Sequence, residues 1–212
     1  MKKIGIIGSG MVAKVLASGF TKYGYQVMLG TQSKEKISGL QKETGVVAGT
    51  FEETAAFGEI VILAVKGSAA ETVVTSLADK LSGKTVIDTT NPIADQPPVN
   101  GVMHFFTSLE SSLMERLQKI VPNAGFVKAF NSVGSMFMID PKFELRPTMF
   151  ICGNNDAAKK EVRGLLEMVG WEAEDMGNAE AARAIEPLCI LWCIPGMREN
   201  KWNHAFKLMK SK

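Results

Sequence analysis

The sequence predicts an α/β fold in which helices cover both faces of a parallel sheet. Short apolar segments alternate with helical periodicity over the first two-thirds of the chain. The segment 60–65 is almost continuously apolar, which is typical of a central parallel strand covered on both faces. Repeated strand–helix–strand units favour right-handed crossovers, so we expect a doubly wound parallel sheet. Its strands are expected at residues 3–8, 25–29, 46–48, 60–65, 85–88 and 126–130.

The expected helices lie between these strands. Two pairs, Thr50 with Glu53 and Ser68 with Glu71, fit the capping box that starts a helix. The segment 92–108 contains three prolines and a glycine and is expected to be a loop. Periodicity places further helices at about 11–23, 34–44 and 109–121.

The pattern changes after about residue 135. A helical segment begins at Asn178, with a kink or a break expected near Pro187 and again near Pro195-Gly196. Before it, a strand, a helix that Asn155 or Asp156 caps, and a second strand are expected at 148–152, 157–169 and 171–175. We therefore predict a first domain over residues 1–135 and a small C-terminal domain over 136–212.

The C-terminal helical segment is apolar on more than one face. Such a helix needs more than one neighbour to bury it, and a two-fold partner supplies a second one. We therefore predict a homodimer in which this segment helps to close a substrate cleft. The apolar residues concerned are Leu188, Ile190, Leu191, Trp192, Ile194 and Met197.

Composition narrows the functional class. Hydrophobic residues make up 46% and charged residues 22%, with a formal net charge of +2, as in an ordinary globular protein. That charge argues against a nucleic-acid partner. No stretch approaches the roughly 20 apolar residues that a membrane helix needs, so we expect no membrane partner and a cytoplasmic location. The cysteines Cys152, Cys189 and Cys193 form no CxxC motif, and we expect reduced thiols and no metal site.

A glycine-rich turn carries the strongest functional signal. Residues Gly8–Ala13 match G-x-G-x-x-[GA] directly after a strand and at the start of a helix. The first glycine permits the tight turn, and Gly10 lets a pyrophosphate approach the helix N-terminus. This context predicts a Rossmann-type dinucleotide-binding domain. The expected contacts are Gly8, Ser9, Gly10, Met11 and Val12.

The end of the second strand indicates which dinucleotide binds. NAD sites usually place a carboxylate there, but none occurs between Leu29 and Lys34. Hydroxyl, amide and ammonium donors suit a 2′-phosphate instead. We therefore predict NADP(H), bound at this end by Thr31, Gln32, Ser33, Lys34 and Lys36.

Three further loops should flank the nicotinamide half of the cofactor, because they follow the fourth, fifth and sixth strands. Asn91 is expected to hold the carboxamide or ribose, or to form a turn before proline. Lys66 is expected to contact the ribose or an acidic substrate, or to face water. The candidate residues in these loops are Ala64, Val65, Lys66, Asn91, Pro92 and Asn131.

Groups for acid–base catalysis are scarce. The two histidines, His104 and His204, lie in a loop and in the C-terminal tail. No Ser-His-Asp arrangement and no HExxH motif occur. We therefore assign no catalytic residue and expect the cofactor to carry the chemistry.

These features resemble the NADP oxidoreductase family that uses the deazaflavin coenzyme F420. The resemblance rests on Ile4–Gly10, Leu29–Gln32, Thr148–Asp156 and Gly177–Leu188, the last like the family's Ser-Arg-x-x-Glu helix. It implies a dimer and direct hydride transfer between NADP(H) and a ring stacked on the nicotinamide. It also implies that Thr31, Gln32 and Lys36 occupy the 2′-phosphate positions.

The sequence departs from that family in two places. One is the 2′-phosphate end of the cofactor, and the other is the set of loops that would face the second substrate. Gln32 stands where the family has an arginine, so Lys34 or Lys36 must supply the charge. Val65-Lys66 stands where the family often has Ile-Pro, and Asn131-Ser132 replaces a Thr-Ile-like pair. The cofactor half therefore carries over better than the deazaflavin half.

Three functions are consistent with this pattern. The first is an NADP(H)-dependent oxidoreductase that transfers a hydride to or from a flavin- or deazaflavin-like acceptor. The second is reduction of a small imine or carbonyl, as in pyrroline-carboxylate reductases, although the strands expected after residue 135 count against it. The third is a non-enzymatic NADP(H) sensor.

Overall fold

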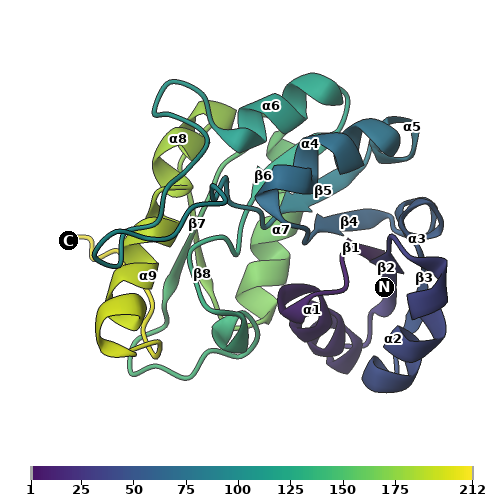
Figure 1. The fold of residues 1–212 in the computed structure, drawn as a ribbon, viewed down its shortest axis with the longest axis horizontal. Coiled ribbons are helices and arrows are strands. Elements are labelled where there is room, and N and C mark those ends of the chain that lie inside the picture. Colours follow the sequence, from purple (N-terminus) through teal and green to yellow (C-terminus); the bar gives the residue numbers. More distant parts are fainter. Residues whose placement is uncertain (1, 212) are drawn as a thin grey trace.

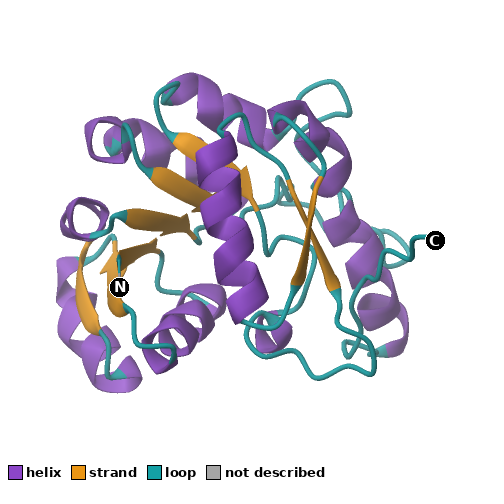
Figure 2. Cartoon of the chain, turned by 180° about the vertical axis from the view of Figure 1, so that it is seen from behind, coloured by secondary structure: helices purple, strands orange, loops and turns teal. Residues whose placement is uncertain are grey.

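A doubly wound parallel sheet forms the centre of the computed structural model, which describes residues 2–211 (Figures 1 and 2). Its six strands run in the order β3-β2-β1-β4-β5-β6, and every neighbouring pair is parallel. This is the order of a dinucleotide-binding Rossmann sheet, so the predicted fold class is confirmed. The strands are β1 (Lys3–Ile7), β2 (Gln26–Thr31), β3 (Val47–Thr50), β4 (Ile60–Leu63), β5 (Thr85–Asp88) and β6 (Gly125–Lys128).

Helices cover both faces of this sheet, as the apolar strands require. Residues of α1 and α2, together with those of a later helix, α7, share one buried core with Ile4 and Ile62. Residues of α3, α4, α5 and α6 share the second core with Val61 and Val86 on the opposite face. The helices are α1 (Met11–Lys22), α2 (Ile37–Thr44), α3 (Phe51–Phe57), α4 (Gly67–Ser76), α5 (Ala78–Leu81) and α6 (Leu113–Ile120).

A second, two-stranded parallel sheet follows the first. It consists of β7 (Thr148–Ile151) and β8 (Glu172–Asp175), joined by α7 (Asp156–Met168). Asn155 caps α7 by accepting a hydrogen bond from the Ala158 N–H at 2.9 Å. The last helices are α8 (Ala182–Ile185) and α9 (Leu188–Glu199).

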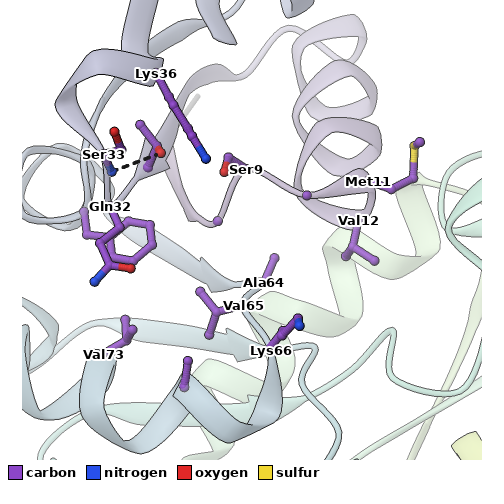
Figure 3. A pocket seen from close by; sticks show the side chains of 15 residues that line it. Ser9, Met11, Val12, Gln32, Ser33, Lys36, Ala64, Val65, Lys66 and Val73 are labelled. Carbon is purple, nitrogen blue, oxygen red and sulfur yellow. Dashed lines mark hydrogen bonds between the residues drawn. The ribbon is translucent and has the colours of Figure 1, made fainter. Parts of the chain in front are cut away.

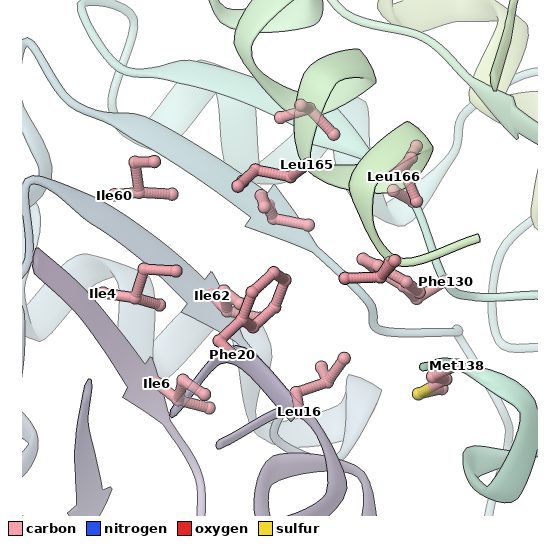
Figure 4. Packing of buried hydrophobic residues seen from close by; sticks show 14 of the residues in the cluster. Ile4, Ile6, Leu16, Phe20, Ile60, Ile62, Phe130, Met138, Leu165 and Leu166 are labelled. Carbon is pink, nitrogen blue, oxygen red and sulfur yellow. The ribbon is translucent and has the colours of Figure 1, made fainter. Parts of the chain in front are cut away.

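Helix α7 joins the small sheet to the large one. Leu165 and Leu166 lie in the same core as Ile60 and Ile62 of β4 (Figure 4). The first core therefore contains residues from both sides of residue 135. The division into domains 1–135 and 136–212 stays a prediction.

One local prediction was wrong, and one alternative of a second prediction does not occur. Ser68 and Glu71 form no capping box, because α4 begins at Gly67 with Lys66 as its N-cap residue. A Cβ atom at Gly67 would lie 1.9 Å from the Asn91 carbonyl oxygen, so the first residue of α4 has room only for a glycine. Helix α9 continues through Pro195, so of the kink or break expected there, the break does not occur. The break at Pro187 is confirmed, because α9 begins directly after it.

Packing explains why α9 is not broken. A proline removes one backbone N–H and crowds the preceding turn, which disfavours a helix. Trp202 packs directly on Gly196, the residue after Pro195, and the Trp192 indole N–H donates to the His204 carbonyl at 2.9 Å. The chain after α9 therefore holds the helix on both sides of the proline. None of the helices within residues 2–211 has the length and apolar character needed to cross a bilayer.

Candidate functional site

An elongated cavity of about 660 Å³ lies at the carboxyl edge of the large sheet (Figure 3). The β1–α1 turn, the end of β2 and the β4–α4 turn form its walls. Twelve of its fifteen lining residues are predicted cofactor contacts: Gly8, Ser9, Gly10, Met11, Val12, Thr31, Gln32, Ser33, Lys36, Ala64, Val65 and Lys66.

The two glycines of the β1–α1 turn lie in different surroundings, so the reason for a glycine differs between the two positions. Gly8 has φ 145°, and a Cβ atom there would lie 2.2 Å from the Ala64 carbonyl oxygen. Gly10 precedes α1, and a Cβ atom there would meet nothing within 4 Å. The open space at Gly10 leaves the backbone accessible at a helix N-terminus, which fits a pyrophosphate.

The part of this cavity beside the end of β2 combines a lysine with polar side chains. Lys36 extends toward the β1–α1 turn in Figure 3, and none of the fifteen described residues that line the cavity is acidic. The Thr31 hydroxyl is buried and accepts from the Ser33 N–H at 3.4 Å, so it shapes the loop. Lys34 lines a neighbouring groove with Glu52 and Glu53 instead. Lys36, and not Lys34, therefore brings a cation to the cavity.

Three residues that line this cavity were not predicted from the sequence. Phe51, Ala69 and Val73 complete the apolar walls of the cavity. Phe51 is the first residue of α3 and directly follows the Thr50 cap, whose capping box is confirmed. An aromatic residue directly after the third strand was the available signal, because that position lies at the same edge of the sheet.

A second cavity of about 370 Å³ adjoins the first. The two share four lining residues, namely Val12, Ala64, Val65 and Lys66. The β5 end contributes Thr89, Thr90 and Asn91, and the following loop contributes Asp95. The two cavities therefore lie side by side along the ends of β1, β2, β4 and β5.

The remaining predicted contacts lie in or behind the wall of the second cavity. Pro92 is buried. Asn131 is also buried, and its Nδ2 donates to the Asn91 Oδ1 at 3.2 Å and to the Ile185 carbonyl at 3.0 Å. The Asn91 Nδ2 in turn donates to the Asn131 carbonyl at 2.7 Å. Asn131 therefore positions Asn91 from behind and joins it to α8.

A buried ionic cluster lies below this wall and was not predicted. Lys128 Nζ contacts Asp88 Oδ2 at 2.6 Å and Glu186 Oε1 at 2.9 Å, and all three side chains are buried. Burial alone would lower the pKa of Lys128, but the two carboxylates outweigh burial and raise it. Asp88 and Lys128 occupy paired positions in β5 and β6. Opposite charges at the ends of these two neighbouring strands were the available sequence signal for the Asp88–Lys128 contact.

Neither histidine lines these two cavities. His204 stacks on Trp192, with ring centroids 4.9 Å apart, and its Nε2 lies 2.8 Å from the Trp192 carbonyl oxygen. Burial raises the pKa of the Cys152 thiol to about 12, so it stays protonated. Within residues 2–211, no group of three potential ligands is placed to hold a metal ion.

Comparisons with known proteins agree with this geometry. The model of the family described as NADP oxidoreductase coenzyme F420-dependent matches residues 3–92. Metalloreductase STEAP3 of Rattus norvegicus is 30% identical over 197 residues, which cover 91% of this chain. The chain spans only 38% of the length of that relative.

Two smaller relatives are matched over most of their length. The F420-dependent NADP reductase of Methanocaldococcus jannaschii is 25% identical over 178 residues, covering 78% of this chain and 79% of that protein. A solved structure from Arthrobacter sp. FB24, provisionally described as an F420-dependent NADP reductase, has a TM-score of 0.92 at 27% identity. It covers 99% of this chain and 100% of its own. Residues 3–92 therefore match the coenzyme F420-dependent NADP oxidoreductase family, and the chain as a whole is similar to NADP reductases.

Proposed function

We propose that this chain transfers a hydride between NADP(H) and a flavin- or deazaflavin-like acceptor. The observation that carries this proposal is the pair of adjoining cavities along the carboxyl edge of the sheet, which share four lining residues. It has open backbone at Gly10, a cation at Lys36 and no acidic side chain among the fifteen residues that line its first part. This combination suits a dinucleotide with a phosphate on its adenosine ribose.

The chain's own residues would bind and orient the two reactants. The β1–α1 turn would hold the pyrophosphate, while Gln32, Ser33 and Lys36 would surround the 2′-phosphate. Lys66 and Asn91 would flank the nicotinamide end. When bound, the cofactor supplies the hydride, so the protein needs to align two rings and exclude water.

The second cavity would receive the acceptor. It combines apolar Ile93 and Ala94 with Lys66, Ser68 and Asp95, so it offers a flat-ring surface and polar edges. The family name suggests a deazaflavin acceptor, and the name of the metalloreductase relative suggests a metal acceptor. Flavin-like rings fit a mechanism without a protein acid or base.

A turnover assay tests the proposal. NADPH oxidation, followed by its absorbance, should be seen with at least one acceptor from a panel of deazaflavins, flavins, quinones and ferric chelates. Turnover only with small imines or carbonyls would favour the pyrroline-carboxylate reductase-like alternative. NADPH binding without any turnover would favour a sensor.

We also propose that the protein is a cytoplasmic homodimer. Leu191 and Met197 of α9 are 55% and 41% exposed, and Val99 in the loop beside α9 is 58% exposed. Gly101 of that loop packs against Met197 and Arg198, so the loop lies against the C-terminal end of the helix. The three free cysteines suit a reducing compartment.

Sedimentation at micromolar concentration tests the assembly. We expect a dimer, and Leu191→Glu should shift it toward monomer while the free energy of unfolding of the monomer stays nearly unchanged. Glu199→Gln on the same helix is the control. A monomer in the unmodified protein would refute the dimer.

A further inference from the structure

The buried ionic cluster carries an uncompensated charge. Lys128 contributes one positive charge, and Asp88 and Glu186 contribute two negative charges. Glu186 also accepts hydrogen bonds from the Leu113 and Met114 N–H groups, both at 3.0 Å. These groups begin α6, and a helix N-terminus carries only about half a positive charge. The cluster is therefore net negative.

The cluster is bonded directly to the wall of the second cavity. Asp88 Oδ1 accepts from the Thr90 N–H at 2.9 Å and from the Thr90 hydroxyl at 2.7 Å. Lys128 Nζ donates to the Thr90 carbonyl at 2.9 Å. Thr90 itself lines the cavity, so one residue separates the charge from the ligand space.

Burial makes this charge effective over a longer distance than a surface charge. All three side chains are 0–1% exposed, and effective dielectric constants in protein interiors are far below that of water. The charged side chains that line the cavity itself, Lys66 and Asp95, are exposed, opposite in sign and screened by solvent. They leave the field of the cluster largely unopposed.

We propose that the Asp88–Lys128–Glu186 cluster makes the site bind the oxidised nicotinamide ring in preference to the reduced ring. This inference rests on the proposed function, which places the nicotinamide end in the second cavity. Loss of a hydride converts the neutral ring to a cation, and a fixed negative field favours the cation. The cluster acts through electrostatics and contacts neither reactant, so these are positioning and field-setting residues.

Comparing the affinities for NADP+ and for NADPH distinguishes this electrostatic role of the cluster from a purely structural role. Loosening the wall would weaken NADP+ and NADPH alike, whereas removing one negative charge weakens NADP+ selectively. Glu186→Gln and Asp88→Asn each bring the net charge of the cluster to zero. The exposed residue Glu180, on the same C-terminal segment, offers a matched control as Glu180→Gln.

The experiment is an equilibrium titration of each folded protein with NADP+ and with NADPH. In either cluster variant, the ratio of the NADP+ Kd to the NADPH Kd should rise about fivefold or more, while Glu180→Gln should leave it unchanged. Asp88→Asn decides the matter if Glu186→Gln does not fold. A ratio that moves less than about twofold overturns this inference and leaves the proposed function standing. An unmodified protein that binds neither cofactor overturns both.

Discussion

Asn91 and Asn131 hold each other in place at the ends of adjacent strands. The Asn91 Nδ2 donates to the Asn131 carbonyl at 2.7 Å, and the Asn131 Nδ2 donates to the Asn91 Oδ1 at 3.2 Å. Since Asn131 also donates to the Ile185 carbonyl, one amide joins the cavity wall to the C-terminal segment. Asn91 can still contact a ligand, but its orientation is set by the protein.

Asn131→Ala should lower the free energy of unfolding by about 1–3 kcal/mol, because it leaves the Asn91 and Ile185 oxygens without their donor. Urea unfolding measures this loss. NADPH affinity should fall less than turnover, because the phosphate contacts lie elsewhere. Asn123→Ala, at an exposed position, is the control. Equal stability of the two variants would show that the amide contributes nothing.

Gly10 provides a test of where the pyrophosphate binds. A side chain there meets no protein atom within 4 Å and the backbone φ is −80°, so Gly10→Val should fold normally. It should abolish NADPH binding, because the side chain fills the space that the phosphate needs. Circular dichroism and NADPH titration measure the two effects.

The control for that substitution is Gly39→Val. Gly39 lies in α2, also with nothing within 4 Å, and is away from the cavity. It should keep full NADPH affinity. Normal binding by Gly10→Val would mean that the cofactor site is elsewhere.

Local patterns explain which elements could be predicted. β5 was predicted with its correct ends, because an apolar strand between turn residues is a local signal. The capping box at Ser112 and Glu115, which starts α6, was missed although its spacing fits the motif. The continuity of α9 could not be read from the sequence, since it depends on contacts with Trp202.

The residues of the candidate site also fall into those with a local sequence signal and those without one. Gly10 and Lys36 follow from a motif and from the chemistry of a strand end, so they were identified in advance. Glu186 joins Lys128 across 58 positions of the chain, and only the folded topology brings them together. Long-range pairs of this kind have no local signature.

Lys36 should control the preference for the phosphorylated cofactor. Lys36→Ala removes the cation that lines the cavity together with Gln32 and Ser33, so the NADPH Kd should rise about tenfold or more, while the NADH Kd stays nearly constant. Lys34→Ala is the matched control, because Lys34 lines the neighbouring groove. Fluorescence titration measures all four affinities. An equal effect of the two substitutions would contradict this assignment.

Glu115 should make the stability of the protein depend on acid pH. The Arg183 guanidinium donates two hydrogen bonds to Glu115, at 2.6 and 3.0 Å, and Ser112 donates further ones. Despite burial, which opposes the shift, these contacts lower the pKa of Glu115 from 4.5 to about 2.

A carboxylate with a lowered pKa stabilises the fold above its unfolded-state pKa and loses that contribution as pH falls. The contribution of Glu115 should therefore be complete above about pH 5 and should disappear progressively toward pH 2. Because Arg183 is 39% exposed, screening reduces it, and we expect about 1–2 kcal/mol at pH 7. Urea unfolding of the unmodified protein and of Glu115→Gln should show that difference at pH 7 and a smaller one at pH 3. A difference that is constant between these pH values would mean that the Arg183 pair does not perturb Glu115.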